Sequence, residues 1–150
     1  MINQLKSEQI DELVADSVIG TLICFDRNEK VKFPITYVKE GEYVYSYSKD
    51  LEKIMVMRKD PAVLLKVFKV SGESGWLSAN VLGIYEELDG INAEIARTIL
   101  KDKLMACAIK DHSYEVHGLT PQYIQGIVES SNVIYRIHII KKTGKYRSLP

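Results

Sequence analysis

A strand rich in serine and tyrosine runs directly into a short basic helix in the stretch YSYSKDLEKIMVMRKDP. Ser46, Tyr47 and Ser48 offer hydroxyl groups at the end of the strand, and Lys53 lies in the first turn of the helix predicted over residues 51–59. A lysine is usually more favourable in the last turn, where the helix dipole attracts a cation. An anion such as a phosphate monoester, bound by the helix N-terminus, the lysine and the hydroxyls, explains the position. The alternative is a solvated lysine on a surface helix.

Histidines lie close to carboxylates at one further place. His112 and His117 are near Asp111 and Glu115, which are residue types that ligate metals. This stretch shows neither a helical nor a strand period, so we interpret it as a solvated loop in preference to a metal site.

The two cysteines, Cys24 and Cys107, form neither a disulfide framework nor a zinc-ligand spacing. Cys24 lies on a predicted buried strand, where we expect a packed thiol. Both thiols are expected to be reduced, as in a cytoplasmic protein. The sequence shows no pairing of a nucleophile with a base and no glycine-rich phosphate loop, since GESG is interpreted as a turn.

The composition is that of one globular domain spanning residues 1–150, with 46% apolar and 27% charged residues. Twenty basic side chains balance twenty acidic ones, so no global field attracts nucleic acid or a membrane surface. No run of about 20 apolar residues is present that would span a bilayer. The polar N-terminus lacks the features of a secretory signal, and a cytoplasmic protein is expected.

The elements that must position the anion site are mostly strands. Pro34 cannot donate to a ladder, so its strand is expected at a sheet edge or at a local break. Gly83 indicates a bulge or a close backbone approach. We predict strands over 18–25, 31–38, 43–48, 62–70, 76–88 and 132–140, helices over 8–16, 51–59 and 91–104, a polar hairpin loop over 26–30, a short helix within LTPQYIQG, and a basic tail after residue 140.

Short connections predict an antiparallel arrangement of these strands. The first three strands are expected to form a meander, and the fourth and fifth to form a long hairpin. Closure into a small barrel hides the sheet edges, and the scarcity of helices between strands excludes a doubly wound parallel sheet. The predicted fold is therefore mainly β within the α+β class, a six-stranded antiparallel barrel with flanking helices.

This order of elements resembles the pyridoxamine 5'-phosphate oxidase-like family of FMN-binding split β-barrels. The resemblance is carried by GTLICFDRNEKVKFPITYV, YVYSYSKDLEKIMVMRKDPAVLLKV and WLSANVLGIYEEL, and it covers roughly residues 5–90. The C-terminal VIYRIHIIKKTGK is similar to members related to nitroimidazole-resistance proteins and flavin reductases. The resemblance implies a split barrel that forms a homodimer, with FMN at the interface.

The resemblance also assigns cofactor-binding positions. The strand containing Pro34 would line the flavin ring with main-chain groups, and the next strand end would lie near the ribityl chain and phosphate. Lys53 would bind the phosphate, and the region of Trp76 and Ser78 would reach the flavin of the opposite subunit. The assigned residues are Pro34, Ile35, Thr36, Tyr37, Ser46, Tyr47, Ser48, Lys53, Trp76 and Ser78.

Three positions depart from the family pattern. Relatives carry a small residue where this chain has Leu51, often a basic residue where it has Glu52, and often histidine or threonine in place of Tyr47. Glu52 and Asp50 both bring negative charge toward the predicted phosphate. Lys49 or Arg58 would then have to help bind it.

The resemblance implies an FMN-dependent oxidoreductase that passes electrons from NAD(P)H to a small acceptor. Arg136 and His138 have the spacing with which true pyridoxamine-phosphate oxidases hold their substrate, but the tryptophan-rich C-terminal segment of those enzymes is missing. Two polar residues facing solvent are the favoured interpretation. Alternatives to an enzyme are a flavin-binding module without turnover, a haem-binding module using His117 or His138, and a cofactor-free interaction domain.

Overall fold

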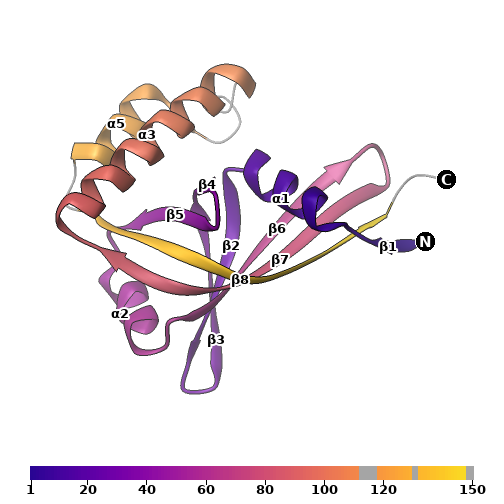
Figure 1. Ribbon diagram of the computed structural model, residues 1–150, viewed down its shortest axis with the longest axis horizontal. Coiled ribbons are helices and arrows are strands. Elements are labelled where there is room, and N and C mark those ends of the chain that lie inside the picture. Colours follow the sequence, from indigo (N-terminus) through magenta and orange to yellow (C-terminus); the bar gives the residue numbers. More distant parts are fainter. Residues whose placement is uncertain (112–117, 130–131, 148–150) are drawn as a thin grey trace.

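The computed structural model describes residues 1–111, 118–129 and 132–147, and it contains one antiparallel sheet with helices at its sides (Figure 1). The sheet has eight strands: seven follow the order β3-β2-β6-β7-β8-β5-β4, and β1 pairs with β8 off this path. The strands are β1 (Ile2–Gln4), β2 (Ile19–Asp26), β3 (Glu29–Thr36), β4 (Val38–Glu40), β5 (Tyr43–Ser48), β6 (Ala62–Ser71), β7 (Gly75–Leu88) and β8 (Val133–Arg147). The helices are α1 (Ser7–Asp16), α2 (Leu51–Lys59), α3 (Gly90–Asp111) and α5 (Pro121–Glu129).

The α+β class and the antiparallel sheet are confirmed, whereas the count of six strands and a closed barrel are wrong. The short strands β1 and β4 account for the difference in number. The sheet does not close by a ladder, because its path ends at β3 on one side and at β4 on the other. The edge position predicted for the strand of Pro34 is confirmed, since β3 pairs only with β2.

The hairpin between β2 and β3 is tighter than the predicted loop over residues 26–30. Arg27 and Asn28 have φ of 51° and 68°, and both strands extend to this two-residue turn. Two successive residues with positive φ make the turn that matches the twist of paired strands. Asn28 is among the residue types that tolerate this conformation.

The predicted meander of the first three strands is confirmed in part: the second strand is broken at Tyr37, and its continuation β4 pairs antiparallel with β5, which pairs with β8 on its other side. The basic tail predicted after residue 140 instead extends β8 to Arg147, where it pairs with β7 and β1. Main-chain hydrogen bonds to β7 and β1 make this pairing, which does not require apolar side chains in the tail. The predicted long hairpin of β6 and β7 is confirmed.

Two apolar clusters hold the sheet and the helices together. The larger one fills the concave side of the sheet, where α1 contributes Ile10 and Leu13 and α2 contributes Ile54 and Met57. The second cluster joins α3 and α5 to β4, β5 and β8, and it includes Tyr45 of β5. Figure 1 shows α3 and α5 lying side by side, apart from α1 and α2. The outer side of β5 is therefore covered by α3 and α5.

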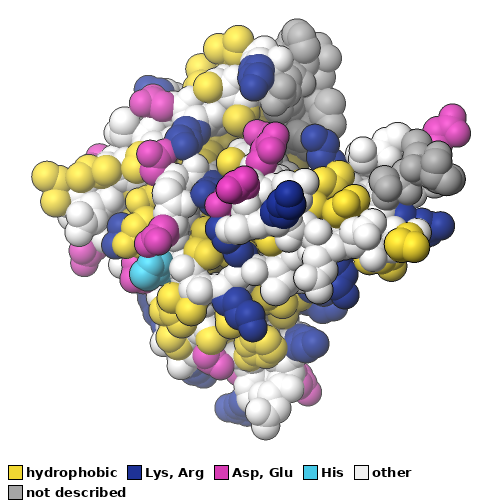
Figure 2. Space-filling view, turned by 45° about the vertical axis from the view of Figure 1, so that its right-hand side comes forward, with side chains coloured by type: hydrophobic (Ala, Val, Ile, Leu, Met, Phe, Trp, Pro, Cys, Tyr) yellow, Lys and Arg dark blue, Asp and Glu magenta, His cyan; other side chains and the backbone are white. Residues whose placement is uncertain are grey.

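The surface carries both signs of charge. On the face drawn in Figure 2, basic and acidic side chains are interspersed and do not separate into fields of one sign. No helix in the described part of the chain is long and apolar enough to cross a membrane.

A bulge between Leu82 and Gly83 lets β7 follow β8, as the sequence predicts for Gly83. An added Cβ at Gly83 would lie 2.4 Å from Cγ2 of Ile137 and 2.6 Å from the carbonyl oxygen of His138. Gly83→Ala is therefore expected to lower the free energy of unfolding by about 1–3 kcal/mol.

Urea unfolding measures this loss, and Gly126→Ala is its matched control. Gly126 lies within α5, and an added Cβ there would meet no atom within 4 Å. Its replacement is expected to stabilise the protein by roughly 0.5–1 kcal/mol, because alanine favours the helix. Equal effects of the two substitutions would contradict the close approach at Gly83.

Candidate functional site

A pocket of about 310 Å³ lies between β3, β5 and the start of α2. It opens where the two ends of the sheet come together without pairing. Six of the ten predicted site residues line it. They are Pro34, Ile35, Thr36, Tyr47, Ser48 and Lys53; the other lining residues are Phe33, Lys49, Asp50, Tyr123 and Tyr135.

The edge of β3 presents unpaired main-chain groups to this pocket. Ser46 Oγ donates to the carbonyl oxygen of Thr36 at 2.6 Å, so this carbonyl points away from β2 and toward β5. Groups two residues apart on a strand point the same way, so the Pro34 carbonyl also faces the gap. Proline at a position that does not bond to β2 removes no ladder hydrogen bond. The pocket thus has main-chain donors and acceptors on its β3 side.

Ser46 and Tyr37 lie behind the pocket. Ser46 is fully buried and ties β5 to β3 through its bond to Thr36. Tyr37 follows β3, its ring is buried, and its hydroxyl donates to the carbonyl oxygen of Val14 at 2.8 Å. The Tyr37 side chain therefore attaches α1 to the sheet and does not face the pocket.

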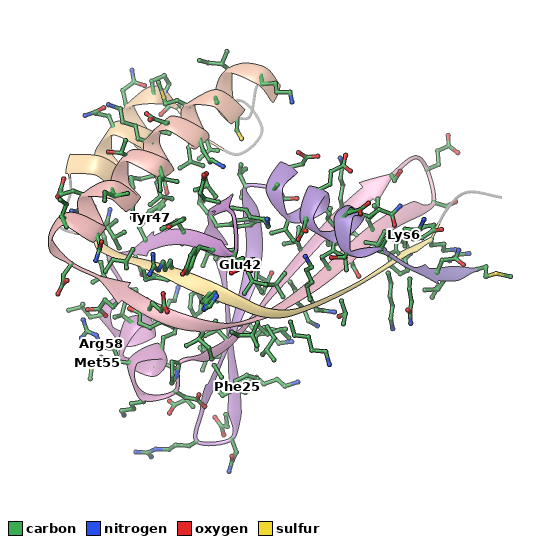
Figure 3. The ribbon with its side chains drawn as sticks, in the orientation of Figure 1. Lys6, Phe25, Glu42, Tyr47, Met55 and Arg58 are labelled. Carbon is green, nitrogen blue, oxygen red and sulfur yellow. The ribbon has the colours of Figure 1, made fainter. Side chains whose placement is uncertain are left out.

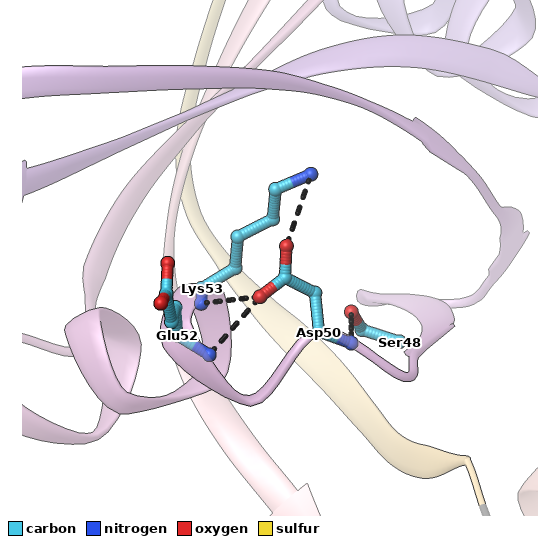
Figure 4. Close-up of polar contacts among 4 residues, drawn as sticks. All are labelled: Ser48, Asp50, Glu52 and Lys53. Atoms are coloured by element: carbon cyan, nitrogen blue, oxygen red, sulfur yellow. Dashed lines mark hydrogen bonds and ion pairs between the residues drawn. The ribbon is translucent and has the colours of Figure 1, made fainter.

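The N-terminus of α2 is capped by the protein's own carboxylate (Figure 4). Asp50 Oδ1 accepts from the backbone N–H groups of Glu52 at 3.0 Å and Lys53 at 3.4 Å. Ser48 Oγ in turn accepts from the N–H of Asp50 at 3.0 Å. Two of the helix N–H groups that were predicted to bind an anion therefore already have an acceptor. An anion in this pocket would depend on the lysines and hydroxyls.

Lys53 is held at the rim of the pocket. Its Nζ lies 3.7 Å from Asp50 Oδ2 and 4.7 Å from the centre of the Phe33 ring, and 37% of its side chain is exposed. An ion pair so exposed contributes little to stability, so the ammonium group can change partners at small cost. Glu52 and Leu51 are exposed and do not line the pocket.

Two tyrosine hydroxyls meet on the side of the pocket that faces the helices. Tyr47 from β5 hydrogen-bonds to Tyr123 from α5, and Figure 3 shows Tyr47 between its strand and the paired helices. Burial raises the pKa of Tyr47 far above its usual value, and the contact with Tyr123 raises it further. Tyr47 therefore stays protonated and acts as a hydrogen-bonding group.

Tyr123 and Tyr135 were not predicted as site residues. Tyr135 is fully buried on β8, directly across from Ser46, and it lines the same pocket. The alternation of VIYRIHII places Tyr135 on the same face as Ile137, which indicates an inward side chain. Nothing in the local pattern around Tyr123 indicates that α5 approaches β5.

Trp76 and Ser78 lie far from this pocket in the same chain. They are paired with Arg147 and Lys145 at the opposite end of the sheet, and Trp76 stacks on Phe68 with ring centres 6.2 Å apart. Their predicted contact is with the flavin of a second subunit, and it stays a prediction.

Arg136 and His138 share the outer face of β8, as their spacing predicts. Arg136 Nε donates to Glu86 at 2.6 Å, and its guanidinium lies 4.1 Å from the Tyr43 ring centre. His138 stacks on Tyr43 with ring centres 5.0 Å apart, and its Nε2 lies 3.7 Å from Glu42. Both side chains therefore have partners outside the pocket.

The described residues contain no group of three or more metal-ligating side chains. His112, Glu115 and His117 lie outside the described residues. Cys24 is buried, and burial raises the pKa of its thiol to about 11, with a further contribution from the charge of Asp60. A protonated, enclosed thiol is the packed residue that the sequence predicts.

Comparison with protein-family models gives no match for this chain. An uncharacterized protein of Rhizobium meliloti is 27% identical over 146 residues, which covers 96% of this chain and 94% of that protein. The similarity to this relative covers nearly the whole chain, but the name of the relative gives no function.

Solved structures share the fold. A FAD-binding protein from Mesorhizobium loti matches with a TM-score of 0.77 and 23% identity over 99% of both chains. A candidate pyridoxamine 5'-phosphate oxidase from Corynebacterium glutamicum matches with a TM-score of 0.69 and 17% identity, over 99% of this chain and all of that one. A haem-binding protein from Mycobacterium smegmatis matches with 0.67 and 16%, over 90% of this chain and 51% of that one. The chain therefore has the pyridoxamine 5'-phosphate oxidase-like fold that the sequence predicts.

Proposed function

We propose that the protein binds a flavin in the pocket between β3 and β5, with FMN as the cofactor. The observation that carries this proposal is the free main-chain edge of β3, which shares one pocket with Lys53. At about 310 Å³ the pocket is at the lower end of the range of about 300–1,000 Å³ found for ligand pockets. It would hold part of the cofactor, with the remainder along the open rim.

The β3 edge suits the flavin ring because their hydrogen-bonding groups are complementary. The pyrimidine edge of a flavin alternates carbonyl acceptors with one N–H donor. The carbonyl of Pro34 and the N–H of Thr36 face the gap, as the bond from Ser46 to Thr36 requires. An open strand edge of this kind binds extended hydrogen-bonding partners.

The anionic tail would meet Lys53, Lys49 and the Ser48 hydroxyl. Ser48 Oγ accepts from Asp50, which leaves its own proton for a ligand. The charge of Asp50 opposes a phosphate, and Lys53 would have to leave Asp50 to bind one. We therefore expect a modest affinity that is set by these two side chains.

The flavin, when bound, supplies electron transfer, and we propose that it passes electrons from NAD(P)H to a small acceptor. The protein would contribute binding, orientation and hydrogen bonds to the ring. The raised pKa of Tyr47 keeps this phenol a donor over the physiological range.

The named properties of proteins with this fold support a flavin and also keep a second cofactor open. Structures of the fold include a FAD-binding protein and a haem-binding protein. Because function resides in the site and not in the fold, we weigh haem by the residues present. His138 is partly exposed and stacked on Tyr43, away from the pocket, and it would have to leave Glu42 to ligate iron.

The purified protein, mixed with FMN, FAD or haem and then desalted, is expected to retain FMN and show the absorption bands of a bound flavin. Retention of FAD in preference to FMN would contradict the mononucleotide, and a Soret band would favour haem. A colourless sample from all three mixtures would contradict cofactor binding. Bleaching of the flavin by NADH or NADPH under argon would then distinguish a reductase from a flavin store.

Opposite charge changes at Lys53 and Asp50 are expected to change FMN affinity in opposite directions. Lys53→Ala should weaken FMN binding by about tenfold through loss of a charge-assisted contact. Asp50→Asn keeps a capping oxygen for α2 and should strengthen FMN binding by roughly three- to tenfold. Fluorescence titration measures both affinities, and thermal melting checks that each variant is folded.

Riboflavin and Glu52→Gln are the controls for this pair. Riboflavin lacks the phosphate, so its affinity should change little in either variant. Glu52→Gln makes the same charge change as Asp50→Asn on the same helix turn, but Glu52 does not line the pocket. If FMN and riboflavin change equally, or if Glu52→Gln acts like Asp50→Asn, Lys53 and Asp50 do not contact the phosphate.

We further propose a homodimer in which a second copy brings Trp76 and Ser78 to the flavin. The support is the outer face of β6 and β7, where apolar side chains lie beside Trp76 and again beyond the pair Lys66 and Asn80. Phe68 and Val70 are each 63% exposed there, and Leu82 and Ile84 are partly exposed farther along β7. Monomers rarely expose large apolar side chains in such a row, so this face is the expected contact between copies.

Light scattering of the purified protein is expected to give about twice the 17.1 kDa mass of the chain. Phe68→Glu combined with Val70→Glu should give the mass of a monomer and should reduce flavin retention, because Trp76 and Ser78 of the second copy are lost. Ile109→Glu is the control, since Ile109 is 73% exposed on α3. A monomeric wild type that still retains flavin would contradict the shared site.

A further inference from the structure

Tyr135 lines the pocket, and its buried hydroxyl group has no hydrogen bond of normal geometry to any described residue. The side chain is 0% exposed and faces the concave side of the sheet from β8. Ser46 lies directly across the β5–β8 ladder and is near enough to influence the pKa of the phenol. Ser46 gives its own proton to the Thr36 carbonyl, and its contact with the Tyr135 hydroxyl does not have hydrogen-bond geometry. The Tyr135 hydroxyl is therefore left without a regular partner.

Such a group needs an explanation, because native proteins satisfy nearly all buried polar atoms. The neighbouring phenol, Tyr85, shows that this fold can supply a hydrogen-bond partner to a tyrosine hydroxyl at this place. Tyr85, whose ring centre lies 5.1 Å from that of Tyr135, donates to Glu87 at 2.7 Å. Glu87 is held in turn by two bonds from Arg58, at 2.8 and 2.9 Å. Of these two adjacent phenols, Tyr85 has a hydrogen-bond partner and Tyr135 does not, and only Tyr135 lines the pocket.

We propose that the Tyr135 hydroxyl is a binding group that donates a hydrogen bond to an acceptor atom of the flavin ring. The inference rests on the proposed flavin site and adds a residue on β8 to the side of the pocket opposite the β3 edge. Burial raises the pKa of Tyr135, so the group is a donor at any physiological pH. The ligand would supply the hydrogen bond that the free protein lacks.

Tyr135→Phe tests this inference because it removes one oxygen and leaves the ring. If the hydroxyl waits for a ligand, the ligand-free variant should melt at the same temperature as wild type or higher, since an unsatisfied group is lost. Its affinity for FMN should fall by about three- to tenfold, because a typical hydrogen bond contributes a factor of this size. The absorption maximum of the bound flavin should also shift, which reports the donor independently of stability.

Tyr85→Phe is the matched control. It removes an existing hydrogen bond to Glu87, so the ligand-free protein should melt at a lower temperature. Tyr85 does not line the pocket, so the FMN affinity and the flavin spectrum should stay as in wild type. Tyr135→Phe should therefore change FMN binding but not lower the melting temperature, whereas Tyr85→Phe should lower the melting temperature but not change FMN binding.

The contrary result is a Tyr135→Phe variant that melts lower than wild type, as Tyr85→Phe does, and binds FMN with unchanged affinity and spectrum. The hydroxyl would then be satisfied within the protein, and this inference would fail while the proposed function stands. A wild-type protein that takes up no flavin would overturn the proposed function and this inference together.

Discussion

The open seam between β3 and β5 is the constraint on which the site depends. The sheet runs through seven strands from β3 to β4, and among the described residues no ladder joins β3 to β5. Pro34 has no N–H to offer across the seam, and the hydrogen bond from Ser46 to Thr36 spans it at one point. A sheet edge is normally paired or covered, because its free groups attract other strands. Here those groups face a pocket.

Helix capping and ligand binding compete at the start of α2. Asp50 satisfies two N–H groups of the helix and attracts Lys53, which stabilises this turn of the chain. The same carboxylate lowers the positive potential that an anionic ligand would meet. One residue thus serves the fold and opposes the ligand. The exposure of the Lys53 side chain keeps this opposition small.

The fold itself leaves the function open. Proteins named for FAD and for haem share this architecture at 23% and 16% identity with the chain. Three groups in the pocket therefore support a flavin: a strand edge with free main-chain atoms, a lysine that can change partners and a buried phenol. The second apolar cluster adds α5 to one side of the pocket, where Tyr123 contacts Tyr47.

The sequence by itself determined the local features of this protein. The bounds of α2, its capping by Asp50, the edge position of Pro34 and the close approach at Gly83 all follow from the stereochemistry of a few neighbouring residues. Only the tertiary structure decided that β8 lies between β7 and β5, that the basic tail continues β8, and that Tyr123 and Tyr135 reach the pocket. Pairing between distant strands depends on register and twist over the whole sheet, which no short window of sequence contains. Six predicted site residues meet in one pocket because they lie on adjacent segments of the chain. Trp76 and Ser78 lie at the other end of the sheet and do not reach this pocket within the same chain.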